Sequence, residues 1–311
     1  MTTLLYSHSA AHRHATPDGH PERVGRIAAI ERVLGENRFG ALVRREAPLG
    51  ADASLLLAHS PRHVSAIRAA APSQGFARID ADTTMSPGSL EAALRAVGAG
   101  TAAVDAVIAG EARNAFIAMR PPGHHAERDR AMGFCLFNTA AIAALHARAR
   151  HGLTRVAVID FDVHHGNGTQ DIFWRDPNAF YGSTHQMPLY PGTGARSETG
   201  AGNIHNFPLA AGDGSGAFRT TMDGLLLPAL DAFAPKFMVI SAGFDAHRDD
   251  PLGGLALAED DFAWITRKLM ETADTHCGGR IVSVLEGGYD LAALAASTAA
   301  HVTALMSEKA N

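Results

Sequence analysis

The chain has 311 residues, of which 46% are hydrophobic and 19% charged, and its formal net charge is -5. These values are ordinary for a globular protein with a large buried core. The negative balance gives no overall attraction to nucleic acid or to an anionic membrane surface. No apolar run approaches the roughly 20 residues that a membrane-spanning helix needs. Two cysteines, Cys135 and Cys277, are too few for a disulfide framework and do not indicate a cysteine-rich zinc module.

The amino-terminal residues lack the basic segment of a secretory signal peptide and run into a histidine-rich stretch within a dozen positions. We therefore expect a cytoplasmic protein. The chain has no internal repeat, low-complexity tract or linker with a change of composition. One domain covering residues 1–311 is the simpler expectation.

The apolar spacing predicts a regular succession of elements. The first part holds a strand at 3–7, a loop at 7–21, a helix from 22, a weak strand near 43, two short helices within 51–70 separated at Pro61, and a long helix at 89–109. Strands then follow at 115–120, 155–162, 179–184, 237–242 and 280–285, with helices at 138–151, 215–233, 259–276 and 291–306. Such alternation is typical of βαβ units, so we predict an α/β fold with a parallel sheet covered on both faces. The loop at 187–206 is long enough to indicate a function.

An apolar run that ends in Asp160, Asp162 and His164 is the most informative stretch. Because side chains alternate along a strand, we expect these three on one side and Phe161 and Val163 on the other. Two carboxylates and an imidazole are costly to bury unless a metal or a hydrogen-bond network satisfies them. The alternative is a polar strand end that faces water.

Three further predicted strands end in unusual residues. The motifs are MRPPGHH at 119–125, SAGFD at 241–245 and LEGGY at 285–289. Ligands of open parallel sheets bind beyond the carboxyl ends of the strands, so these motifs are expected to line one site. Asp162, His164 and Asp245 would supply three metal ligands and leave a position open for water. By ligand type alone the metal could be Zn(II), Fe(II), Co(II) or Mn(II).

His124, His125 and Tyr289 complete this candidate site. An imidazole titrates near neutral pH and can act as a base, and a protonated phenol can donate to a developing oxyanion. Together with a metal that activates water, these groups indicate metal-assisted amide hydrolysis. Taken singly, each has a simpler interpretation: a surface histidine pair, a packing tyrosine, or for Asp245 a partner in a solvated salt-bridge cluster.

The ordered motifs resemble those of the histone deacetylase and acetylpolyamine amidohydrolase superfamily. The matching segments are HPER at 20–23, RPPGHHAE at 120–127, GFCLFN at 133–138, DFDVHHGNG at 160–168, SAGFDAH at 241–247, DPLGG at 250–254 and EGGY at 286–289. The resemblance implies an arginase-like three-layer α/β/α fold with a central, mostly parallel sheet. Asn167 and the Glu286-Gly-Gly form look like the class II branch.

The resemblance also implies roles for individual residues. Asp162, His164 and Asp245 would hold one Zn(II) per chain, and His125 would be the general base. His124 would be oriented by Asp160, and Tyr289 would bind the oxyanion. Asn167 stands behind His125, where class I enzymes place an aspartate, so the pKa of His125 is expected to differ from class I values.

Two further sets of residues follow from the resemblance. Phe134 and Tyr190 would form the aromatic walls of a narrow acyl-lysine channel, together with Gly133, Gly288 and Leu252. A structural K(I) ion would be held by side chains of Asp160, Asp162 and Ser183 and by backbone oxygens of His164 and Thr184. Leu252 stands where polyamine-specialised members carry a glutamate, which favours acyl-lysine over a cationic substrate.

We therefore expect a zinc-dependent amidohydrolase that removes acetyl or other acyl groups from acyl-lysine or small N-acyl amines through metal-activated water. An acetylpolyamine amidohydrolase is one alternative, and an arginase-like binuclear manganese enzyme is a second. A non-catalytic protein that binds acetylated ligands is an alternative of another class. We expect no nucleic-acid or membrane partner. The sequence is compatible with a monomer and with a homo-oligomer. The low lysine content, with Lys236, Lys268 and Lys309 only, favours a bacterial source.

Overall fold

A parallel sheet of eight strands forms the centre of the protein, seen in a computed structural model that describes residues 2–307. The strands are β1 (Thr3–Ser7), β2 (Val43–Glu46), β5 (Asn114–Ile117), β6 (Val156–Asp160), β7 (Ala179–Gln186), β8 (Ile204–Leu209), β9 (Phe237–Ala242) and β10 (Ile281–Leu285). Their order is β2-β1-β5-β10-β9-β6-β7-β8, and every pairing is parallel. Two short antiparallel strands, β3 (Ala77–Arg78) and β4 (Thr84–Met85), lie apart from it. The predicted α/β class with a parallel sheet is confirmed.

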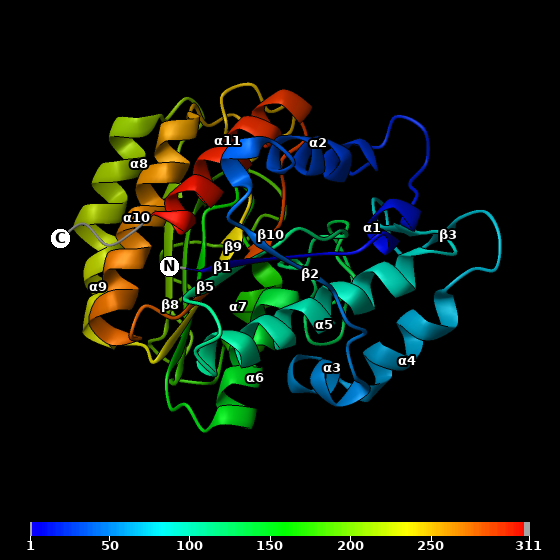
Figure 1. The fold of residues 1–311 in the computed structure, drawn as a ribbon, viewed down its shortest axis with the longest axis horizontal. Helices are drawn as coiled ribbons and strands as arrows, with labels where there is room; N and C mark the ends of the chain where they lie inside the picture. The colour runs from blue at the N-terminus through cyan, green and yellow to red at the C-terminus, as the bar shows by residue number, and fades with distance from the viewer. Residues whose placement is uncertain (1, 308–311) are drawn as a thin grey trace.

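Helices cover both faces of this sheet (Figure 1). On one face α2 (Gly25–Leu34) packs on α11 (Leu291–Met306), which packs on α10 (Glu259–His276). On the other, α5 (Ser89–Ile108) packs on α6 (Thr139–His151), beside α3 (Asp52–Ala58). The remaining helices are α1 (Ala10–Arg13), α4 (Pro61–Ala70), α7 (Asn167–Phe173), α8 (Ser215–Thr221) and α9 (Leu227–Phe233). Alanine-rich α5 and α6 bury most of their residues, because small side chains allow close packing.

The four strands that carry the unusual motifs lie side by side in the middle of the sheet. In the order β5-β10-β9-β6, every residue of these strands is buried. The sequence of a strand that is buried on both faces is a nearly continuous apolar run, as in these four strands. Because all four run in the same direction, their carboxyl ends meet at one edge, which we call the carboxyl edge.

The structure differs from the sequence-based expectation in several places. Strand β6 ends at Asp160, two residues earlier than predicted, so strand alternation does not extend to His164. The helix expected at 215–233 is divided by a π-helical turn at Met222–Leu226, ahead of Pro228. The expected loop at 187–206 leads into an unpredicted strand, β8. Helices α1 and α7 were also missed, because both are shorter than a periodic pattern can reveal.

Within residues 2–307, no helix combines the length and the apolar character that crossing a bilayer requires.

Candidate active site

Short loops at the carboxyl edge bring together the polar residues that follow the four central strands. Asp160 is the last residue of β6, and Asp162 and His164 follow it by two and four residues. Asp245 follows β9, Tyr289 follows β10, and the pair His124 and His125 follows β5. All of these side chains are buried or nearly so. The convergence expected from the motif positions is therefore present.

Asp162, His164 and Asp245 offer ligand atoms that all lie within 4.8 Å of one another. Nδ1 of His164 lies 3.2 Å from Oδ1 of Asp162 and 3.1 Å from Oδ2 of Asp245. Backbone N–H groups hold the carboxylates in place. His164 and Gly287 donate to Asp162 at 2.9 Å each, and Val163 donates to Asp245 at 2.8 Å. One imidazole and two carboxylates form a donor set that suits zinc.

Glycines make room for these carboxylates. A Cβ atom on Gly287 would lie 2.1 Å from Oδ2 of Asp245, and one on Gly243 would lie 2.0 Å from Oδ2 of Asp162. Any larger residue at either position would displace a carboxylate oxygen. The glycines after β9 and β10 are therefore required by the geometry of the site.

The electrostatics of this trio favour a bound cation. Burial opposes a charge on His164, yet its hydrogen bonds to Asp162 and Asp245 raise the pKa of His164 to about 10. Burial and the charge of Asp162 raise the pKa of Asp245 to about 7. The two carboxylates thus share a positive group between them, here the imidazolium. A divalent ion in the same place would replace that proton.

The two adjacent histidines have different partners. Nδ1 of His124 lies 3.0 Å from Oδ2 of Asp160, whereas Nδ1 of His125 lies 2.8 Å from Oδ1 of Asn167. Burial lowers the pKa of His124, but the charges of Asp162 and Asp160 outweigh it and raise that pKa well above its ordinary value. Burial, with positive charge on His124, lowers the pKa of His125 well below its ordinary value. Sequence reasoning placed a carboxylate behind one histidine and an amide behind the other, and the structure has both contacts.

Tyr289 lies over a buried arginine that sequence reasoning did not single out. The guanidinium carbon of Arg26 is 4.9 Å from the centre of the Tyr289 ring. Arg26 also donates to the backbone oxygens of Gly288 and Glu286, at 2.6 and 2.5 Å. Burial raises the pKa of the Tyr289 phenol well above its ordinary value, so the hydroxyl stays protonated. The arginine therefore holds the loop that carries Tyr289.

Two further carboxylates, Glu286 and Asp250, also support the site. Oε2 of Glu286 accepts the N–H groups of Gly123 and His124, at 2.6 and 3.1 Å, and so joins the ends of β5 and β10. Oδ2 of Asp250 accepts the N–H of Tyr289 at 2.7 Å. Both residues belong to the motifs quoted above, but the sequence offered no sign of these backbone contacts.

A cavity of about 260 Å³ leads to the site. Four of the five residues predicted for a substrate channel line this cavity: Gly133, Phe134, Tyr190 and Leu252. Its other lining residues are Asp82, His125, His164, Leu189 and Tyr289. Asp82 and Leu189 were not predicted. Gly288 does not line the cavity; its φ is +124°, a conformation that favours glycine, and its carbonyl faces Arg26.

The region predicted to hold potassium lies between β6 and β7. Asp160 and Ser183 are register partners, and Ser183 Oγ lies 2.9 Å from Nδ1 of His185. The hydroxyl of Thr184 is buried without a hydrogen-bond partner. Asp160, Asp162 and Ser183 are all buried, so their oxygen atoms lie in a region where a cation would be well sheltered.

Comparisons with known proteins agree with this architecture. The model of the histone deacetylase domain matches residues 20–305. The chain is 41% identical to the histone deacetylase-like amidohydrolase of Pseudomonas aeruginosa over 86% of this chain and 71% of that protein. It is 38% identical to the chloroplastic histone deacetylase 10 of rice (Oryza sativa subsp. japonica) over 98% of this chain and 73% of that protein. The crystal structure of the HDA15 HD domain superimposes with a TM-score of 0.93 at 35% identity, covering 98% of this chain and 89% of that one.

A three-layer α/β/α protein with a buried polar site at the carboxyl edge is of the arginase-like class. Within that class, the chain belongs to the histone deacetylase family. It is accordingly a hydrolase of the deacetylase type, and the family resemblance stated from the motifs is confirmed.

Proposed function

We propose that the protein is a zinc-dependent deacetylase that removes acetyl or other acyl groups from acyl-lysine side chains or related N-acyl amines. The observation that carries the proposal is the trio Asp162, His164 and Asp245, whose ligand atoms converge within 4.8 Å beside a cavity also lined by His125 and Tyr289. One Zn(II) per chain fits these three ligands and would leave a position open. When bound, zinc would lower the pKa of water and polarise the acyl carbonyl.

His125 is suited to accept a proton from the attacking water. Its Nδ1–H donates to Asn167, which leaves Nε2 as the acceptor nitrogen, and its low pKa keeps the ring neutral. The protonated ring can then deliver that proton to the leaving amine. Nδ1 of His124 is hydrogen-bonded to Asp160, and the raised pKa of His124 makes its ring a poor proton acceptor. We therefore assign His124 as a positioning group beside the base.

The Tyr289 hydroxyl is suited to donate a hydrogen bond to the oxyanion that forms on the acyl carbon. The cavity gives the acyl group an aromatic passage, because the rings of Phe134 and Tyr289 lie 5.9 Å apart edge to face and His125 and Tyr190 lie 5.2 Å apart. Gly133 has a φ of +57°, and a Cβ there would lie 2.4 Å from the ring of His125. A side chain at position 133 would therefore press on the base.

An acetylated polyamine is the second candidate substrate, favoured by one observation. Asp82 lines the cavity and would offer a negative charge to a cationic chain, whereas Leu252 on the same cavity offers none. We place acyl-lysine first because Leu252 stands where a gatekeeping glutamate would be needed for strong preference.

The other finer assignments are proposals of the same kind. A K(I) ion held by Asp160, Asp162, Ser183 and the backbone of His164 and Thr184 would neutralise the buried carboxylates at the end of β6. The class II assignment is supported by the residue types, namely Asn167 behind His125 and the Glu286-Gly-Gly form, which resemble that branch. The lysine-poor composition supports a bacterial source, and a cytoplasmic location is part of the same proposal. The net charge of -5 gives no overall attraction to nucleic acid or to an anionic membrane surface, and the oligomeric state is to be measured directly.

The deciding experiment measures hydrolysis of an acetyl-lysine peptide, an acetylated polyamine and a trifluoroacetyl-lysine peptide by protein stripped of metal and then restored with zinc. Zinc-restored turnover of acetyl-lysine supports the proposal, and faster turnover of the polyamine supports the second candidate. Turnover of the activated trifluoroacetyl amide alone would point to a different acyl group. Zinc binding without hydrolysis of any substrate would favour the non-catalytic alternative.

A further inference from the structure

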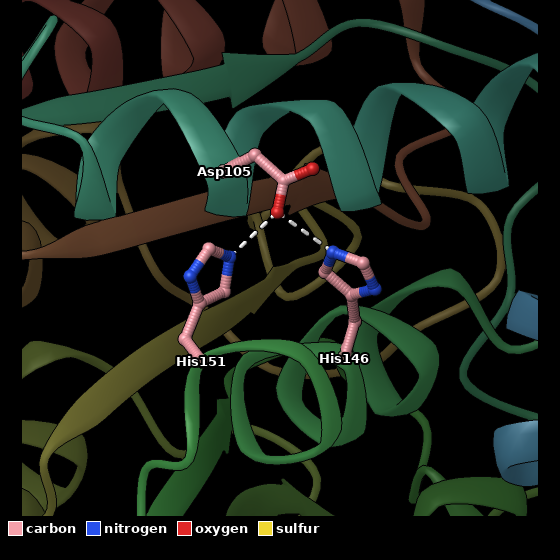
Figure 2. Close-up of side chains that lie close together, drawn as sticks. All are labelled: Asp105, His146 and His151. Carbon is pink, nitrogen blue, oxygen red and sulfur yellow. Dashed lines mark hydrogen bonds and ion pairs between the residues drawn. The ribbon is translucent and has the colours of Figure 1, made fainter.

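A second group of metal-ligating side chains lies outside the candidate active site, between two helices of one outer layer. Asp105 belongs to α5, and His146 and His151 belong to α6 (Figure 2). Nε2 of His146 lies 2.8 Å and Nε2 of His151 lies 2.6 Å from the same carboxylate oxygen, Oδ1 of Asp105. The three ligand atoms all lie within 4.8 Å of one another.

This cluster lies at the opposite edge of the sheet from the candidate active site. Helices α5 and α6 both run back from the carboxyl edge, since each leads directly into the start of a strand, β5 and β6 respectively. Asn138, which caps α6, contacts the backbone of His124 and Ala126 near the site. His151 is 13 residues further on, about 20 Å along the helix at roughly 1.5 Å per residue.

The electrostatic surroundings of Asp105 favour a bound cation. Asp105 lies in the last turn of α5, where a carboxylate is repelled by the partial negative charge of the helix end, and that turn holds no basic residue. The carboxyl end of α6 lies beside it, because His151 is the last residue of that helix. Burial raises the pKa of Asp105, but hydrogen bonds from His151 and His146 outweigh it and lower that pKa, so the carboxylate is ionised.

We propose that Asp105, His146 and His151 form a second site for a divalent transition-metal ion. Two imidazole nitrogens and one carboxylate oxygen are a donor set that zinc accepts, with water in the remaining position. Tetrahedral zinc with bonds of about 2.1 Å needs ligand atoms about 3.4 Å apart, so the present contacts must each open by about half an ångström to one ångström. The side chains are 14%, 24% and 50% exposed for His146, His151 and Asp105, which leaves freedom for that movement and a path for the ion.

The bound ion would tie α5 to α6 and stabilise their packing. It would also change how a metal count is interpreted. Two ions per chain would arise from two separate mononuclear sites near opposite edges of the sheet, and would not indicate an arginase-like binuclear centre. This inference is independent of the proposed deacetylase activity, since no residue of the cluster lines the cavity.

The test is a zinc titration of metal-free protein by calorimetry, with the bound zinc counted after gel filtration. His146→Ala and His151→Ala are compared with wild type and with His276→Ala. In this matched control one half-buried histidine pairs at 2.6 Å with one carboxylate, Asp231, on a neighbouring helix. We expect two zinc ions per wild-type chain and per His276→Ala chain, but one in each cluster variant. The zinc-induced rise in melting temperature should shrink in the cluster variants, while deacetylase activity with zinc stays within about twofold of wild type.

The two proposals fail in different ways. One zinc per wild-type chain that survives in His146→Ala and His151→Ala overturns the second site and leaves the catalytic site intact. Retention of two zinc ions in both cluster variants would likewise overturn the proposed second site. A single zinc that disappears in His146→Ala, by contrast, supports the second site and contradicts the proposed catalytic one.

Discussion

The amide of Asn167 bridges His125 and Glu127. Its oxygen lies 2.8 Å from Nδ1 of His125, and its nitrogen donates to Oε1 of Glu127 at 2.7 Å. The second contact fixes which way the amide faces, and so fixes His125 Nδ1 as the donor. The group behind the candidate base is therefore a neutral amide whose orientation is fixed by Glu127.

Asn167→Asp would replace that amide by a carboxylate facing Glu127 across 2.7 Å. Two carboxylates at this distance share a proton, so the single variant is expected to change the pH profile little while reducing stability. In the double variant Asn167→Asp with Glu127→Gln the repulsion is gone, and the new carboxylate should raise the pKa of His125. We expect the acidic limb of kcat/KM to move up by about one pH unit in the double variant. Identical profiles for wild type and double variant would contradict this role of Asn167.

Tyr289→Phe should lower kcat on an acetyl-lysine peptide by about 10²- to 10³-fold, because the oxyanion loses a hydrogen-bond donor. The phenyl ring still packs over the Arg26 guanidinium, so the melting temperature should change little. Steady-state kinetics and thermal unfolding of the same preparation measure the two quantities. Turnover near the wild-type value would remove Tyr289 from the mechanism.

Leu252→Glu should increase preference for a cationic substrate, since it adds a carboxylate to a cavity that already holds Asp82. We expect the ratio of kcat/KM for acetylpolyamine over acetyl-lysine peptide to rise about 10-fold, equivalent to about 1.4 kcal/mol. Leu252→Gln is the matched control, with a similar shape and no charge. If both variants change the ratio equally, attraction by charge is not the cause.

Glu22→Gln tests the buried cluster beneath the Tyr289 loop. Glu22 accepts from Arg120 at 2.5 and 2.6 Å and from Arg26 at 3.0 Å, and all three side chains are 0% exposed. Removing this charge leaves two buried guanidinium groups uncompensated, so the free energy of unfolding should fall by about 3–5 kcal/mol. Glu91→Gln, which breaks the exposed pair with Arg13, should cost less than about 1 kcal/mol. Denaturant unfolding of both variants gives the comparison.

His59 should make stability depend on pH. Its Nε2 accepts the N–H of Asn138 and its Nδ1 donates to the carbonyl of Glu127, so the folded protein requires the neutral ring. Burial and His63 lower the pKa of His59 to about 3. Because the folded pKa lies below the ordinary value near 6.5, the unfolded chain binds the proton first, and stability is lost as pH falls from about 6.5 towards 3.

Between pH 7 and pH 5 this one residue should remove about 2 kcal/mol of stability. His59→Gln cannot take up a proton there, so it should be less stable than wild type at pH 7 but lose less on acidification. Unfolding free energies at the two pH values measure this difference. Equal losses for wild type and variant would show that His59 is not the titrating group.

The local pattern of the sequence was enough to predict the class of fold. Apolar periodicity placed helices α10 and α11 and strand β9 at their observed bounds, because each is long or fully buried. The motifs at the strand ends also identified the family. Short elements such as α7 and β8 were missed, since contacts with neighbouring strands, and not local periodicity, stabilise them.

The sequence by itself therefore determined which residue types stand at the ends of buried strands, and that is why Asp162, His164 and Asp245 could be proposed as ligands. Only the tertiary structure decided which strand ends are neighbours, because β10 lies between β5 and β9 in an order unrelated to the chain. Arg26 reaches Gly288 across 262 residues, and Asp105 meets His146 and His151 across a helix interface. Such contacts depend on how layers pack, and local propensity carries no information about that packing.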